Sequence, residues 1–182
     1  MAAPSAIDYA KNIERGNTET NGIRDAELNR QQGINDSIVK SEGGENQYKL
    51  HEELGKVMTD NVTVVRYNDR LQATDDKLRE LQDRFKKISI NDSNLWATQA
   101  IPHARQLYNM LELARVITLG ALNRNESRGA HYKPDFPERD DENFLKTTIA
   151  EYSAEAPVLS YEPVDVSLVE PRKRDYSSKK KG

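Results

Sequence analysis

An apolar helix that runs into a charged, proline-containing loop constrains this chain more than any other feature. In residues 103–122, apolar side chains recur at steps of three and four, which predicts a helix buried on much of its circumference. Pro102 precedes the segment and opens the helix. The following loop, residues 121–141, is dense in charge and contains Gly129, Pro134 and Pro137, so it cannot continue the helix. A fixed, charged loop between apolar elements is the first place to look for binding or chemistry.

Two earlier segments also have helical spacing. Asn68 or Asp69 is expected to cap the second of them, which has a charged outer face typical of a solvated helix surface. Residues 46–66 carry Leu50, Leu54, Val57, Met58, Val62 and Val65. The second carries Leu71, Leu78, Leu81, Phe85 and Ile88, with polar Thr74 and Asp75 interrupting the rhythm. Three such helices joined by short loops predict an antiparallel bundle.

The ends of the chain are less regular. Residues 5–15 predict a short helix that Gly16 ends, and residues 17–45 have only loose helical spacing. Residues 144–168 predict a β-hairpin, because β-branched and aromatic residues flank a break at 153–157, and Pro163 limits the second strand to an edge. The predicted fold is therefore mainly α: an antiparallel bundle of three main helices, then a charged loop and a small β-hairpin extension.

Composition excludes several classes of function. The chain has 182 residues and a net charge of −3, and the last eleven residues hold six basic groups and one acid, which leaves the rest at about −8. A net negative charge on most of the chain does not favour binding to nucleic acid. There is no cysteine, hence no disulfide or thiolate chemistry. No apolar run reaches 18 residues and the N-terminal residues do not resemble a signal peptide, so neither membrane insertion nor export is expected.

Few residues suggest catalysis. The chain has three histidines, and the His51-Glu52 start of a zinc-protease motif fails because position 55 is Gly55. His131 is the acid/base candidate by position, and a structural hydrogen bond to a carbonyl is the favoured alternative. Glu126 and Arg128 are expected either to fix the loop by ion pairs or to meet a partner. Neither a phosphate-binding glycine motif nor a Gly-x-Ser-x-Gly motif is present.

Several stretches together resemble a known family. They are LHEELGKVM at 50–58, RQL at 105–107, LELARVITLG at 111–120, NRNESRGAH at 123–131, Asp135, RDD at 139–141, FLKTT at 144–148 and PRKRDY at 171–176. This wording resembles the C-terminal region of the succinate dehydrogenase and fumarate reductase flavoprotein subunit, in its Gram-positive bacterial form. The resemblance runs from about residue 46 to 176, while residues 17–45 match loosely.

The resemblance implies a domain organisation. Residues 1–16 would be a remnant helix of the preceding flavin domain, 17–126 a helical bundle domain, 127–169 the loop plus β-hairpin extension, and 170–182 a basic flexible tail. The family's glycine fingerprint, flavin-bearing histidine and dicarboxylate-binding residues have no counterpart in this sequence. We therefore expect no catalytic, cofactor-binding or metal-binding residue here, and FAD only in the parent protein.

The resemblance also implies partners. The parent reaction is FAD-dependent oxidation of succinate to fumarate, with electrons passing through iron–sulfur clusters to quinone. This chain would supply scaffold and interface to the flavin domain and the iron–sulfur subunit, in a cytoplasmic complex on the inner face of the cell membrane. The interface candidates are Glu126, Arg128, Gly129, His131, Arg139 and Asp140. A stand-alone helical adaptor and the C-terminal domain of L-aspartate oxidase are the alternatives.

Overall fold

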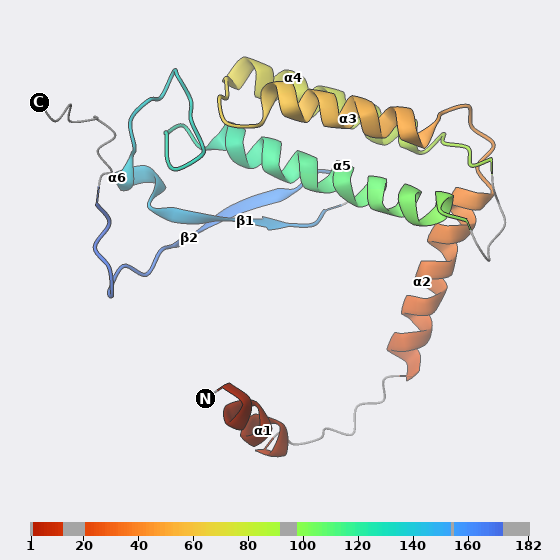
Figure 1. Cartoon of the computed structure of the whole chain (residues 1–182), viewed down its shortest axis with the longest axis horizontal. Helices are drawn as coiled ribbons and strands as arrows, with labels where there is room; N and C mark the ends of the chain where they lie inside the picture. The colour runs from red at the N-terminus through yellow and green to blue at the C-terminus, as the bar shows by residue number, and fades with distance from the viewer. Residues whose placement is uncertain (1, 13–20, 92–97, 154, 173–182) are drawn as a thin grey trace, which may run out of the picture. The chain divides into compact units, whose positions relative to one another are not determined.

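The computed structural model describes residues 2–12, 21–91, 98–153 and 155–172, which form two compact units, Met1–Ser37 and Ile38–Gly182. The first unit holds α1 (Ala2–Asn12) and most of α2 (Asn21–Val39) (Figure 1). Large apolar side chains on both helices, such as Ile7 and Leu28, are exposed. The predicted domain limits at 16, 126 and 169 stay predictions, and the end of the predicted tail, residues 173–182, lies outside the described residues.

The second unit is built on three long helices, α3 (Gln47–Asn61), α4 (Asn68–Phe85) and α5 (Ala100–Asn123). Successive helices run in opposite directions, and each of the three contacts the other two (Figure 1). Asn46 caps α3 by accepting from the backbone N–H groups of Tyr48 and Lys49. The predicted antiparallel helical bundle is therefore confirmed.

The core lies where the three apolar stripes meet. One leucine pair from each helix is less than 4% exposed: Leu50 and Leu54 on α3, Leu71 and Leu78 on α4, and Leu107 and Leu111 on α5. Burying a leucine contributes roughly 1.5–3 kcal/mol to folding, so this seam stabilises the bundle.

Three details differ from the sequence-based expectations. The N-cap of α4 is Tyr67, whose side chain makes no capping bond, and not Asn68 or Asp69. Thr74 and Asp75 do not interrupt the buried face of α4, since both are buried within it. On α5, four large apolar residues remain 39–61% exposed: Tyr108, Met110, Leu113 and Ile117. The described residues therefore bury less of the surface of α5 than the apolar composition of this helix predicts.

After the loop come α6 (Asp141–Phe144) and the predicted hairpin, β1 (Lys146–Glu151) and β2 (Val158–Pro163). The strands pair antiparallel from Lys146 opposite Pro163 to Glu151 opposite Val158. Pro163 is the last residue of β2, and it is tolerated there because each strand of a two-stranded sheet is an edge strand. The hairpin lies along α5 (Figure 1), and side chains from both enclose a small apolar hollow that includes Leu113 and Tyr152. No helix among the described residues is long and apolar enough to cross a membrane.

Candidate functional site

Glu126 is the centre of the loop that follows α5. Its side chain is fully buried and accepts from Arg124 (Nη1 to Oε1, 2.5 Å) and from Arg128 (Nε to Oε1, 2.8 Å; Nη2 to Oε2, 2.9 Å). The backbone N–H of Asp140 donates to its Oε2 at 2.9 Å. Burial raises the pKa of Glu126, but the bonds from Arg128, the Asp140 N–H and Arg124 outweigh it and lower that pKa overall. The Glu126 carboxylate therefore links Arg124 and Arg128, at the start of the loop, to Asp140 near its end.

The two arginines also bond to neighbouring elements. Arg124 also donates to the carbonyls of Phe144 (2.9 Å) and Lys146 (2.6 Å), which ties the end of α5 to α6 and β1. Arg128 reaches Asp141 Oδ1 at 2.7 Å. The sequence did not single out Arg124, because nothing local distinguishes it from a solvated arginine.

Arg139 and Asp140 complete the cluster of predicted residues. Arg139 pairs with Asp141 through two contacts, the Nε to Oδ1 contact being 2.6 Å, and donates to the carbonyl of Arg172 at 2.7 Å. The Asp140 side chain caps α6 by accepting from the Asn143 N–H at 3.0 Å. Each of these side chains makes a hydrogen bond or an ion pair within the chain. Whether any of them also contacts a partner stays a prediction.

Gly129 makes the turn between Arg128 and His131. Its φ is +60°, in the left-handed region that glycine adopts without a steric penalty. Arg128 and His131 exchange backbone hydrogen bonds of 2.8 and 3.0 Å across it. Gly129 therefore supplies the positive φ that this turn requires.

His131 makes the structural hydrogen bond that was one of its two predicted roles. Its Nε2 lies 3.0 Å from the Arg124 carbonyl, and its Nδ1 lies 2.6 Å from Arg66 Nη1. A guanidinium only donates, so Nδ1 must accept and Nε2 must carry the proton. Burial and the positive charge of Arg66 lower the pKa of His131. Both ring nitrogens are engaged, which disfavours an acid/base role.

Lys133 was not predicted to be a site residue, yet it is 1% exposed. Its Nζ donates to the Leu122 carbonyl and to Asn125 Oδ1, both at 3.0 Å, and so satisfies the C-terminal end of α5. Burial and then the charge of Arg66 lower the pKa of Lys133 to about 8. The sequence gives no signal for this burial, because a lysine in a charged loop is usually solvated.

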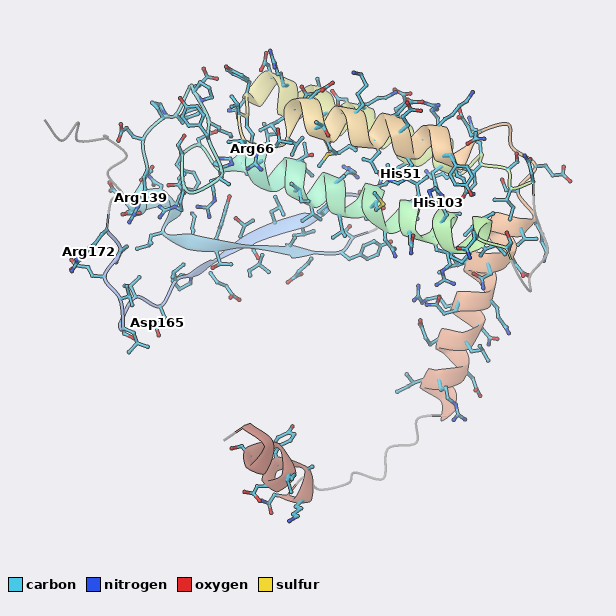
Figure 2. The ribbon with its side chains drawn as sticks, in the orientation of Figure 1. His51, Arg66, His103, Arg139, Asp165 and Arg172 are labelled. Atoms are coloured by element: carbon cyan, nitrogen blue, oxygen red, sulfur yellow. The ribbon has the colours of Figure 1, made fainter. Side chains whose placement is uncertain are left out.

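The other two histidines lie elsewhere, on α3 and α5. His51 Nδ1 and His103 Nε2 are 3.3 Å apart, and the Tyr48 ring packs 4.4 Å from the His103 ring (Figure 2). Burial and then His51 lower the pKa of His103. Within the described ranges, no three histidine or acidic side chains are grouped closely enough to hold a metal ion.

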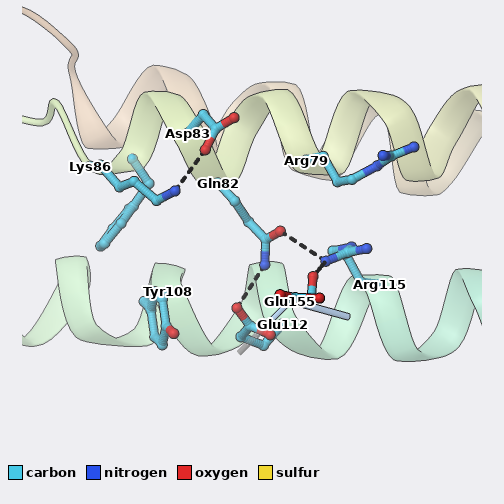
Figure 3. A pocket seen from close by; sticks show the side chains of 9 residues that line it. Arg79, Gln82, Asp83, Lys86, Tyr108, Glu112, Arg115 and Glu155 are labelled. Carbon is cyan, nitrogen blue, oxygen red and sulfur yellow. Dashed lines mark hydrogen bonds and ion pairs between the residues drawn. The ribbon is translucent and has the colours of Figure 1, made fainter. Parts of the chain in front are cut away.

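A cavity of about 240 Å³ opens between α4, α5 and Glu155 (Figure 3). Arg115 donates to Gln82 at 3.4 Å, and Gln82 donates to Glu112 at 2.7 Å, so its walls form a hydrogen-bonded chain. Burial and then Tyr152 raise the pKa of Tyr108 to about 12, so this phenol stays protonated at neutral pH. Tyr108 is therefore neither an activated nucleophile nor a base in this cavity.

The comparison with known proteins identifies the family. The family model described as the fumarate reductase flavoprotein C-terminus matches residues 51–176, which include most of the bundle, the Glu126 loop and the hairpin. The chain belongs to the succinate dehydrogenase/fumarate reductase flavoprotein family. The predicted resemblance is thereby confirmed.

Related sequences and solved structures agree. The chain is 54% identical over 99% of its length to the succinate dehydrogenase flavoprotein subunit of Bacillus subtilis, and 37% identical over 76% to the fumarate reductase flavoprotein subunit of Escherichia coli. It covers 31% and 24% of those two proteins. A quinol–fumarate reductase structure with menaquinol matches 94% of the chain with a TM-score of 0.80 at 33% identity, and the chain covers 30% of it.

The family name implies a flavin, which needs a pocket of matching size and lining. The cavity of Figure 3 and the hollow between α5 and the hairpin are each about 240 Å³, below the ~300–1,000 Å³ of usual cofactor pockets. Neither is lined by a glycine-rich turn at a helix N-terminus, which a flavin pyrophosphate favours. These two cavities do not fit a flavin dinucleotide, and whether this chain binds flavin stays a prediction.

Proposed function

We propose that this chain serves as the scaffold and interface domain of a succinate dehydrogenase flavoprotein and contributes no catalytic residue. The parent reaction would be FAD-dependent oxidation of succinate to fumarate, with electrons passed through iron–sulfur clusters to quinone. The flavin domain of the same polypeptide and the iron–sulfur subunit would be its neighbours. The complex would lie on the cytoplasmic face of the cell membrane.

The exposed apolar face of α5 carries the proposal. Met110, Leu113 and Ile117 follow one another at helical steps of three and four, so they share one side of this long helix, where they are 39–61% exposed. An exposed apolar surface of this kind is typical of one that another protein covers. The chain also spans only about a third or less of the relatives it matches, so those proteins contain other parts that could cover this face.

The test is an immunoblot of source-cell lysate with an antibody raised against this chain. We expect a band far above 20.7 kDa that is fluorescent for covalent flavin and co-purifies with the iron–sulfur subunit. A single band at 20.7 kDa without flavin would overturn the proposal and favour a stand-alone helical adaptor.

In the full enzyme, Leu113→Asp should lower assembly with little change in turnover per assembled complex, and the exposed-site control Asp83→Asn should change neither.

A further inference from the structure

Arg66, in the turn between α3 and α4, is a partly buried cation that meets no carboxylate. Its Nε donates to the Val62 carbonyl at 2.9 Å and its Nη1 contacts His131 at 2.6 Å. Among the described residues, none accepts from its Nη2 and no acid lies within ion-pairing distance. Burial alone lowers the pKa of Arg66. By contrast, five other arginines of this unit with partly or fully buried side chains each pair with a carboxylate: Arg84, Arg115, Arg124, Arg128 and Arg139.

Exposed apolar side chains lie in the two chain segments that meet at Arg66. Val64 is 56% exposed, Val65 46%, Tyr132 41% and Phe136 36%. The two segments are joined because the Tyr132 N–H donates to the Val64 carbonyl (3.2 Å) and the Arg66 N–H donates to the Tyr132 carbonyl (2.9 Å). We call these five residues the Arg66 surface; Figure 2 shows Arg66 at the end of the bundle where this turn meets the loop after α5.

Lys133 lies beside this surface, and its Nζ hydrogen-bonds to a carbonyl and an amide oxygen and not to a carboxylate. Burial and then the charge of Arg66 lower the pKa of Lys133, and the charge of Asp135 offsets only part of this. A partly desolvated cation without a counter-charge is unfavourable, whereas one that gains a carboxylate within a covered interface is stabilised. Arginine with tyrosine and phenylalanine is also the composition enriched at the centres of protein interfaces.

We propose that the Arg66 surface docks a segment of the flavin-domain part of the same polypeptide, which places an aspartate or glutamate on Arg66 and apolar side chains around it. This inference rests on the proposed function. The flavin-domain part is favoured over a separate subunit because a covalently linked neighbour is present at high effective concentration whenever the chain is folded. The cost of the unpaired cation would then be removed permanently.

Photocross-linking in the complete flavoprotein–iron–sulfur complex tests this. The tyrosine at 132 is replaced by p-benzoylphenylalanine, a similar aromatic, and the cross-linked peptide is identified by mass spectrometry. We expect a peptide of the flavin-domain part that contains an aspartate or glutamate. A peptide of the iron–sulfur subunit, or no cross-link in an assembled complex, would overturn the inference while leaving the proposed function standing. Failure of the complex to contain this chain would instead overturn the proposed function.

Variants of Arg66 test the charge itself. Arg66→Met should lower the cross-link yield about tenfold, since loss of one partner of a covered charge pair typically weakens binding at least that much. Arg66→Lys should retain most of the yield, and the matched control Arg70→Met, an exposed arginine over the Tyr67 ring, should leave it unchanged. Flavin content and circular dichroism check that each variant is folded. An unchanged yield in folded Arg66→Met would contradict a carboxylate partner.

Discussion

Asp75 on α4 and Arg115 on α5 form a buried ion pair, with Arg115 Nε 3.0 Å from Asp75 Oδ1 and each side chain 6% exposed. Arg115 also donates to the Glu155 carbonyl at 3.1 Å, which ties the hairpin loop to the bundle. The pair fixes how the two longest helices of the bundle lie against each other.

Removing one partner of this pair should be costly. Asp75→Ala leaves the Arg115 guanidinium buried without a counter-charge, so we expect the free energy of unfolding to fall by about 3–5 kcal/mol in urea denaturation. The double variant Asp75→Leu/Arg115→Met should fall much less, because both charges are gone. Asp76→Ala, at a side chain that is 59% exposed, is the control and should change stability by less than about 1 kcal/mol. Equal losses in Asp75→Ala and Asp76→Ala would show that the buried pair is unimportant.

Glu126→Gln should open the loop after α5. The neutral amide cannot balance Arg124 and Arg128, so we expect a loss of about 3 kcal/mol. Hydrogen exchange should quicken at the Asp140 N–H, which donates to this carboxylate. The exposed control Glu142→Gln should leave exchange in the loop unchanged.

The same carboxylate predicts acid sensitivity of the loop. The folded pKa of Glu126 is lower than its ordinary 4.5, so its contribution to stability is complete above about pH 4.5 and is lost as pH falls through the folded pKa. Exchange at the Asp140 N–H, corrected for its intrinsic pH dependence, should therefore rise below pH 4.5 in the wild type. If Glu126→Gln showed the same rise, another group would be responsible.

The helices and the hairpin were predictable because their signals are local. Leu50, Leu71 and Leu107 lie on stripes that repeat at helical spacing, and such stripes must be buried. The loop at Gly129 was likewise predictable, because glycine and proline residues prevent the helix from continuing there.

The buried charges were not predictable, because each depends on a residue distant in sequence. Asp75 looks like a break in a stripe until Arg115, 40 residues later, lies opposite it. Arg66 and His131 are 65 residues apart, and Lys133 is buried only because its loop folds back over the end of α5. Residue type alone favours exposure for all of these groups.

Lys133 should make stability depend on pH in the alkaline range. Its pKa falls from 10.5 to about 8 on folding, so between these values the unfolded chain binds a proton that the folded chain does not. Stability should therefore rise with pH from about 8 to 10.5, by on the order of 3 kcal/mol from this group. The measurement is urea denaturation of wild type and Lys133→Met at several pH values. As pH rises across this window, the free energy of unfolding of the wild type should increase relative to that of the variant. A constant difference would mean that Lys133 titrates normally.

Two glycines should differ in what alanine costs. At Gly129 an added Cβ meets no atom within 4 Å, so Gly129→Ala should cost only the penalty of a left-handed φ, about 1–2 kcal/mol. At Gly43 an added Cβ would overlap the Lys87 backbone carbonyl, and the Glu45 N–H donates to that same carbonyl at 3.1 Å. Gly43→Ala must therefore displace the backbone, and we expect it to lower the urea midpoint more than Gly129→Ala does. The reverse order would mean that the segment around Gly43 moves aside freely while the turn at Gly129 does not.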